Sequence, residues 1–173
     1  SKPKVMHLND DVFDTPTVAI SNAQAEIRGV IGLLERVVGS VAKPFISNDS
    51  LHDIENDEED FEAGLQNRME KITFLNNEIS SYLIKVNNQD LNDVQSREVF
   101  TLVSVVHNIN SVKNSVNLRL HDLLIKKESQ SKELSDNLIQ EVESYHKKII
   151  KQIKRLGKFF EKYDKDKIDK IVS

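Results

Sequence analysis

Val99–Leu124, VFTLVSVVHNINSVKNSVNLRLHDLL, is the stretch of sequence that decides the fold. Its apolar residues recur at alternating steps of three and four, a spacing that places them on one face of an α-helix. At 1.5 Å of rise per residue, this helix is about 40 Å long. The residues of the apolar stripe are Val99, Leu102, Val106, Ile109, Val116, Leu120 and Leu123. The stretch therefore predicts a long helix with one buried side.

The middle of the same stripe is polar. Asn110, Lys113, Asn114 and Asn117 stand where the repeat requires Leu or Ile. A polar layer in a helical bundle either fixes the register of the helices or forms part of a ligand site. Both interpretations are compatible with the spacing alone.

Composition narrows the classes of protein. A chain of 173 residues with five Gly, three Pro, no Trp and many charged residues favours one elongated, all-helical domain. The absence of Cys excludes disulfides, thiolate catalysis and thiolate metal sites. A formal net charge of −4 argues against nucleic acid as the partner. We also find no nucleophile–base pair, phosphate-binding loop or pair of catalytic carboxylates, so we expect neither an enzyme nor a bound cofactor.

Targeting signals are not evident in this sequence. No run approaches the roughly 18 apolar residues of a membrane span, and SKPKVMHLNDD at the start lacks the apolar centre of a signal peptide. We therefore expect the chain as given to be soluble.

Three further heptad patterns flank the opening stretch, and together they predict an antiparallel up-down bundle of four long helices. Residues 1–14 are expected to form an extended lead-in, and residues 15–173 a single domain. Thr15 should cap the first helix, with Pro16 at its first position. We expect the helix that contains Val99–Leu124 to be the most buried, and a polar turn at 126–131. The predicted helices are 15–43, 57–86, 92–125 and 131–163, followed by a short fifth helical stub at 165–172.

Several stretches resemble the PhoU-like domain of bacterial sodium/phosphate cotransporters. Leu8–Ile20, LNDDVFDTPTVAI, followed by Ala23–Glu26, AQAE, resembles the beginning of that domain, where a Leu-Asp lead-in precedes Thr-Pro and an Ala-rich helix. Ile72–Leu83, ITFLNNEISSYL, resembles its second helix, with the Tyr-Leu pair near the end. Gln95–Arg97 and Leu102–Asn114 resemble its third.

This resemblance implies a regulatory domain that lies at the cytoplasmic face of the inner membrane. It implies a membrane transport domain in the same full-length chain as the partner, control of phosphate uptake through protein contact, and a homodimer as a further assembly. PhoU proteins contain two repeats of three helices. The present chain would cover the first repeat, one helix of the second and a stub.

The resemblance also points to a degraded metal motif. Some PhoU proteins bind metal clusters through Glu-x-x-x-Asp motifs, and the matching positions here are Asn110 and Asn114 on one helix, with Glu70 and Thr73 on another. Amides keep a carbonyl oxygen but lose the negative charge that holds a multivalent ion. We therefore expect no tight metal cluster, and amide-to-amide bonds or water in the polar layer. The acidic segment 47–62 lacks the spacing of a calcium loop.

A basic face follows along the last long helix. Such a face is either solvated or attracted to an anionic membrane or an acidic partner. Two alternatives to the transporter domain remain: a stand-alone helical scaffold or adaptor, and a metal-binding PhoU-like regulator of phosphate signalling. The residues of the candidate partner face are Lys147, Lys151, Lys154, Arg155 and Lys158.

Overall fold

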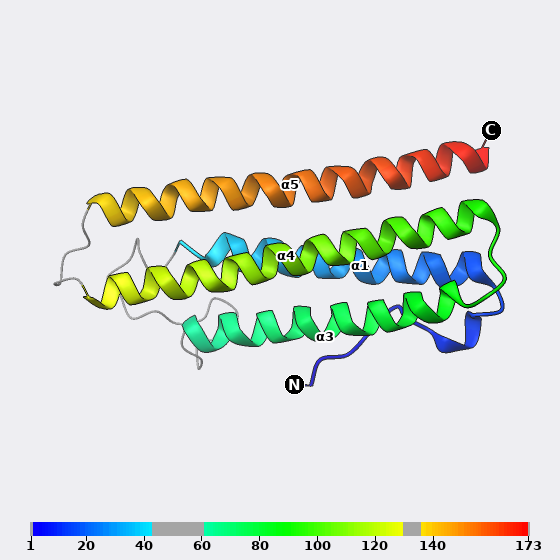
Figure 1. Ribbon diagram of the computed structural model, residues 1–173, viewed down its shortest axis with the longest axis horizontal. Coiled ribbons are helices and arrows are strands. Elements are labelled where there is room, and N and C mark those ends of the chain that lie inside the picture. Colours follow the sequence, from blue (N-terminus) through cyan, green and yellow to red (C-terminus); the bar gives the residue numbers. More distant parts are fainter. Residues whose placement is uncertain (1, 43–60, 130–135, 173) are drawn as a thin grey trace.

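The computed structural model describes residues 2–42, 61–129 and 136–172, and over those ranges it contains helices, turns and short irregular segments but no strand (Figure 1). A short 3-10 helix, η1 (Asp10–Val12), precedes the long helices. These are α1 (Pro16–Ser40), α3 (Phe61–Asn87), α4 (Asp93–Ser129) and α5 (Asp136–Val172). The predicted all-α bundle of four long helices is therefore confirmed. In Figure 1 the colours show that helices successive in sequence run in opposite directions along the molecule.

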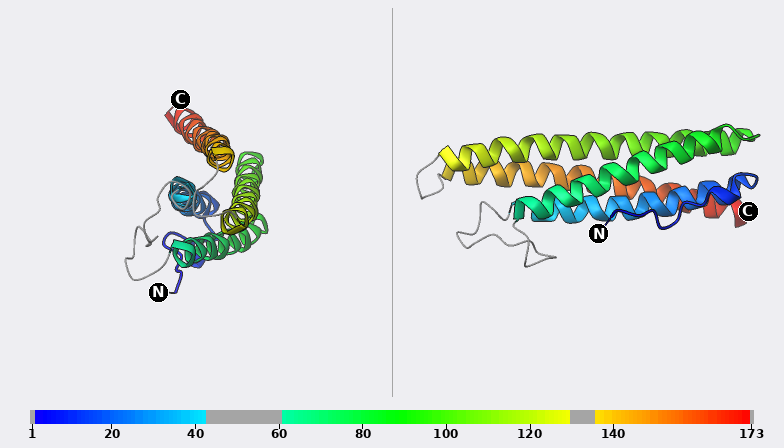
Figure 2. Two further views of the ribbon diagram at one scale, coloured as in Figure 1. Left: turned by 90° about the vertical axis from the view of Figure 1, so that its left-hand side faces the viewer. Right: turned by 90° about the horizontal axis from the view of Figure 1, so that it is seen from below.

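The four helices differ in how many neighbours they have. α1 packs against α3, α4 and α5, and α4 also packs against α3 and α5. The end view in Figure 2 shows α1 and α4 between α3 and α5, which lie on opposite sides. α1 and α4 are therefore the two central helices, with three neighbouring helices each.

The expectation that the helix containing Val99–Leu124 is the most buried is wrong. α1 buries about half of its residues, whereas α4 buries only a narrow stripe along its greater length. The reason is the width of the apolar surface of α1, where Ile31, Leu33 and Val38 widen the heptad stripe and are buried with it. Both helices pack against three others, but the broader apolar surface of α1 buries a larger share of its residues against them.

The start of α1 agrees only in part with the prediction. Pro16 occupies the first helical position, and Thr15 is the N-cap residue, but the Thr15 side chain makes no capping hydrogen bond. The backbone carbonyl oxygen of Thr15 accepts hydrogen bonds from the backbone N–H groups of Val18 at 3.0 Å and of Ala19 at 3.2 Å. The helix ends at Ser40, before the predicted residue 43.

The turn between α3 and α4 is closed by a reciprocal pair of hydrogen bonds. The Gln95 N–H donates to Asn92 Oδ1 at 2.8 Å, and the Asn92 N–H donates to Gln95 Oε1 at 3.0 Å. This arrangement satisfies free N–H groups at the start of α4. The predicted start of the third helix at residue 92 is within one residue of the observed one.

Other predicted boundaries are wrong or lie outside the described residues. α4 continues to Ser129, so there is no turn beginning at Lys126. Basic residues in a last helical turn are favoured by the helix dipole, and polarity alone does not end a helix. The predicted helix starts at 57 and 131 lie outside the described residues.

The predicted stub at 165–172 is not a separate helix. α5 runs without interruption from Asp136 to Val172, across the break expected at residue 164. The segment between 163 and 167 contains neither Gly nor Pro, and its Asp and Lys residues are compatible with an exposed helix.

The lead-in at residues 2–14 is bound to the bundle rather than simply extended. It contains η1, which corrects the prediction of a fully extended segment. The N–H groups of Met6 and His7 donate to Oε1 of Glu26 at 2.7 and 3.3 Å. Glu26 lies on α1 with only 3% of its surface exposed. A buried carboxylate on the central helix therefore holds the chain that precedes it.

A second set of contacts fixes the lead-in to α3. The Tyr82 hydroxyl donates to the Asn9 carbonyl oxygen at 3.0 Å, and the Tyr82 ring lies 4.9 Å from the ring of Phe13, between centroids. Lys85 lies 3.7 Å from the carboxylate of Asp10 and also over the Phe13 ring. The lead-in thus connects the two helices that it crosses.

Candidate functional site

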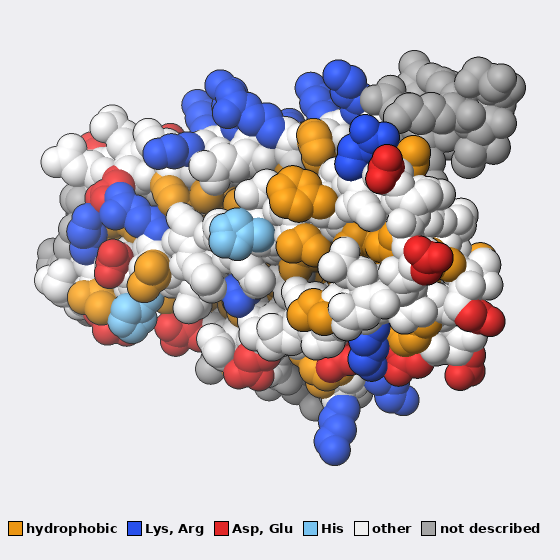
Figure 3. All heavy atoms as spheres, turned by 45° about the vertical axis from the view of Figure 1, so that its right-hand side comes forward, with side chains coloured by type: hydrophobic (Ala, Val, Ile, Leu, Met, Phe, Trp, Pro, Cys, Tyr) orange, Lys and Arg blue, Asp and Glu red, His pale blue; other side chains and the backbone are white. Residues whose placement is uncertain are grey.

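The exposed side of α5 carries a basic face. Residues 144–160 contain no Asp or Glu. Lys147, Lys151, Lys154 and Lys158 follow one another at steps of four and three, a spacing that places them on one side of the helix. All four are exposed, and Figure 3 shows Lys and Arg side chains gathered along α5. The row from Lys147 to Lys158 is about 16 Å long.

The opposite side of α5 faces the core. Ile149, Ile153 and Leu156 are buried there, and the guanidinium of Arg28 on α1 lies 5.4 Å from the centroid of the Phe160 ring. Because the apolar side is already buried within the chain, the basic row is presented outward on a packed helix. The predicted partner-face residues Lys147, Lys151, Lys154, Arg155 and Lys158 are all exposed.

An ion-pair network joins the beginning of α5 to α4. Glu141 accepts hydrogen bonds from Arg119 and from Lys126, the latter at 2.9 Å to Oε1 and 3.2 Å to Oε2. The Arg119 guanidinium also lies 5.8 Å from the centroid of the Tyr145 ring. The hydrogen bond from Lys126 and the two positive charges hold the pKa of the Glu141 carboxyl below its ordinary value, against a smaller opposing effect of burial.

Replacing Glu141 by Gln should therefore destabilise the protein in a manner that depends on pH. The pKa of Glu141 is lowered on folding, so its stabilising contribution is present above the unfolded pKa of about 4.3 and is lost as pH falls through the folded pKa. We expect a loss of about 1 kcal/mol or less near neutral pH, because the pair is partly exposed.

Urea unfolding from about pH 7 to about pH 2 measures this difference. Glu143→Gln is the matched control, because Glu143 is exposed on the same helix. A destabilisation by Glu141→Gln that is as large at pH 2 as at pH 7, after subtraction of the control, would contradict the assignment.

The polar layer predicted for the third long helix is present between α3 and α4, but not all of the predicted residues belong to it. The Asn76 amide Nδ2 donates to Asn110 Oδ1 at 2.8 Å, so the predicted amide-to-amide bond is observed. Asn76 is completely buried, and its own Oδ1 has no hydrogen-bond partner. The hydrogen bond to Asn110 satisfies one side of this buried amide, and the unpaired Oδ1 carries a desolvation cost.

Lys113 extends this layer by one turn. Its ammonium donates to Thr73 Oγ1 at 2.7 Å, and partial burial lowers the pKa of Lys113 below its ordinary value. Asn114 and Asn117, in contrast, are exposed, so their assignment to the buried stripe is wrong. The core passes instead through Ile109 and Val116.

A pocket of about 400 Å³ between α3 and α4 brings together three of the four positions matched to the metal motif, Glu70, Thr73 and Asn114. Asn110 is bonded to Asn76 beside it. Glu70 is the only carboxylate lining the pocket, and it already accepts a bond from Gln66 at 3.2 Å. Lys113 also lines it, and its positive charge opposes a bound cation. Among the described residues, no group of three His, Asp or Glu could hold a metal ion.

Sequence reasoning missed Asn76 and Glu141. Asn76 follows Leu75 and lies four residues after Ile72, at a position next to the apolar stripe, so its burial could have been suspected from the helical spacing. The partner of Glu141 could not be identified in this way, because the spacing on α5 says nothing about which residues of α4 lie opposite.

None of the described helices combines the length and apolarity needed to cross a membrane. Searches against protein-family models, curated proteins and solved structures returned no match to this chain.

Proposed function

We propose that this chain is a non-catalytic regulatory module of a sodium-dependent phosphate transporter, and that it contacts an anionic membrane surface through α5. The exposed basic row of α5 is the observation that carries the proposed contact. The assignment to a transporter, and to a PhoU-like up-down bundle, is supported by the resemblance at Leu8–Ile20 and Ile72–Leu83. In this proposal the module lies at the cytoplasmic face of the inner membrane and controls uptake through contact with the transport domain.

The proposed contact is electrostatic. A basic side chain near an anionic bilayer gains about 1 kcal/mol. The row Lys147, Lys151, Lys154 and Lys158 can approach a flat surface together, because these side chains share one side of a straight helix. Binding should therefore be weak, reversible and sensitive to salt, as suits a domain already attached to a membrane protein.

Co-sedimentation with lipid vesicles tests the contact. We expect the chain to bind vesicles of phosphatidylserine and phosphatidylcholine but not vesicles of phosphatidylcholine alone. Binding should disappear as salt is raised toward about 1 M, where the screening length falls to about 3 Å. Changing Lys151, Lys154 and Lys158 to Glu should abolish binding. A control with the same change of charge at exposed lysines elsewhere should retain most of it; its positions are Lys2, Lys4 and Lys71.

Equal retention on both kinds of vesicle, or equal loss in both variants, would reduce the basic row to a solvated face. The transporter assignment has a separate test in the reading frame upstream of Ser1. We expect it to encode membrane-spanning helices in the same frame. An initiation codon directly before this chain would favour the stand-alone adaptor instead.

A further inference from the structure

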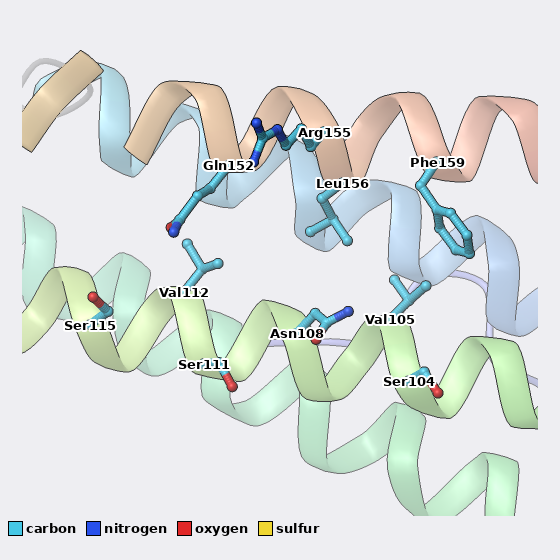
Figure 4. Close-up of a pocket in the computed structure, with 10 residues that line it drawn as sticks. All are labelled: Ser104, Val105, Asn108, Ser111, Val112, Ser115, Gln152, Arg155, Leu156 and Phe159. Carbon is cyan, nitrogen blue, oxygen red and sulfur yellow. The ribbon is translucent and has the colours of Figure 1, made fainter. Parts of the chain in front are cut away.

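A groove of about 470 Å³ lies between α4 and α5, on the side where these two helices have no third helix packed over them (Figures 2 and 4). Its floor includes the apolar side chains of Val105 and Val112 from α4 and Leu156 from α5. Figure 4 shows Leu156 and Phe159 directed from α5 toward α4. Phe159 is 52% exposed, which is a large fraction for an aromatic ring in a helix contact.

The α4 wall of the groove is made of small and polar side chains. Ser104, Asn108, Ser111 and Ser115 line it, at steps of four, three and four residues. Small side chains allow the backbone of another helix to come close. The Ser104 hydroxyl already donates to the carbonyl oxygen of Phe100 at 3.1 Å, so covering it does not leave an unpaired donor. A helix can therefore cover Ser104 without loss of a hydrogen bond, whereas Asn108 and Ser111 offer polar groups to side chains of the covering helix.

The α5 edge of the groove is positively charged. Lys148, Arg155 and Lys162 recur every seven residues along the side of α5 nearest the groove, and all three are exposed. Arg155 also lines the groove itself. None of the ion pairs among the described residues involves these three cations. No Lys or Arg of α4 lines the groove, so its two edges differ in charge.

This asymmetry decides the occupant. A second copy that packed with its cationic α5 edge against this one would bring like charges into close contact, and these repel. An acidic partner is instead attracted to each of the three cations on the α5 edge. The groove runs between the neighbouring helices α4 and α5. A third helix can pack into such a groove and contact both of them.

We propose that the α4–α5 groove binds an amphipathic helix with acidic residues at intervals of seven. Its apolar side chains lie against Leu156, Phe159 and Val112, and its acidic row pairs with Lys148, Arg155 and Lys162. The proposal does not rest on the membrane contact, because that contact uses the outward row of α5 from Lys147 to Lys158.

The test uses the full 173-residue chain, labelled with ¹⁵N, and a synthetic amphipathic peptide of three heptads. The peptide carries Glu once per heptad, Leu twice, and Ala and Gln elsewhere; a second peptide has Gln in place of every Glu. We expect the Glu peptide to shift the amide resonances of Ser104, Ser111 and Gln152, and to bind about tenfold more tightly than the Gln peptide, since exposed ion pairs contribute modestly but together.

Two variants locate the charge effect. Lys148→Gln combined with Arg155→Gln should remove the difference between the peptides, whereas Lys151→Gln combined with Lys154→Gln should leave it unchanged within about twofold. The proposal is overturned by equal affinities for the two peptides, or by shifts confined to residues outside the groove. It is also overturned if anionic vesicles, but not the Glu peptide, shift the groove resonances, or if groove shifts follow protein concentration alone, as a second copy would cause.

Discussion

Replacing Ile109 by Ala should lower the free energy of unfolding by about 2–5 kcal/mol, the range for removing a large aliphatic side chain from a packed core. Ile109 is completely buried on α4, one residue before the Asn110 amide. The substitution removes apolar contact and leaves a cavity that the neighbouring helices can fill only by shifting. Urea unfolding measures the loss.

Leu118→Ala is the matched control, because Leu118 lies on the same helix with 70% of its surface exposed. Its effect should be within about 0.5 kcal/mol, as for most surface substitutions. If Ile109→Ala had the same unfolding midpoint as the parent and as Leu118→Ala, Ile109 would not be a core residue, and α4 would be packed differently from Figure 1.

The second large effect is expected from the amide pair between α3 and α4. Asn110→Ala removes the acceptor of Asn76 Nδ2 and leaves a completely buried amide without a bonding partner. The expected loss is about 1–3 kcal/mol, which is the desolvation penalty of an unpaired buried group. This penalty arises because one amide stays buried after its partner is removed, so a variant that removes both amides is informative.

Changing both Asn76 and Asn110 to Leu should cost much less than the single change, or should even stabilise the protein, because no polar group is left buried without a partner. A double-mutant cycle of Asn76→Leu, Asn110→Leu and the double Leu variant, measured by urea unfolding, isolates the interaction. Additive effects of the two single substitutions would show that the amides do not depend on each other. The double Leu variant also tests the register role of the layer, since a loss of uniform packing would appear as broadened NMR resonances.

The heptad spacing was sufficient to predict the helices but not their relative burial. The stripe from Val99 to Leu123 lies on one side of α4, as expected, because that periodicity follows from helix geometry alone. Which helix becomes central depends on how many apolar surfaces meet, a property of all four helices together. Ile31 and Leu33 indicate the wider apolar surface of α1, but they lie outside the heptad positions, which define only a single stripe.

The polar positions were harder to predict for a related reason. Asn110 and Asn114 are one turn apart and look equivalent in sequence, yet one is bonded to Asn76 and the other is exposed. A helix rotation of a few tens of degrees decides between these outcomes, and that rotation is set by packing against α3. Helix ends were similarly uncertain, because the Lys residues after Leu124 are compatible with both a turn and a final helical turn.

The central position of α1 has a consequence for synthesis of the protein. A ribosome releases α1 first, but α5, one of the three helices that cover it, is made last. The apolar side chains of α1, including Ile27 and Val30, therefore lack part of their packing until α5 has been made. Exposed apolar surface of this kind attracts other nascent chains and chaperones. A ribosome-bound chain stopped before Asp136 should accordingly bind a chaperone that recognises exposed apolar surface more strongly than the full 173-residue chain does.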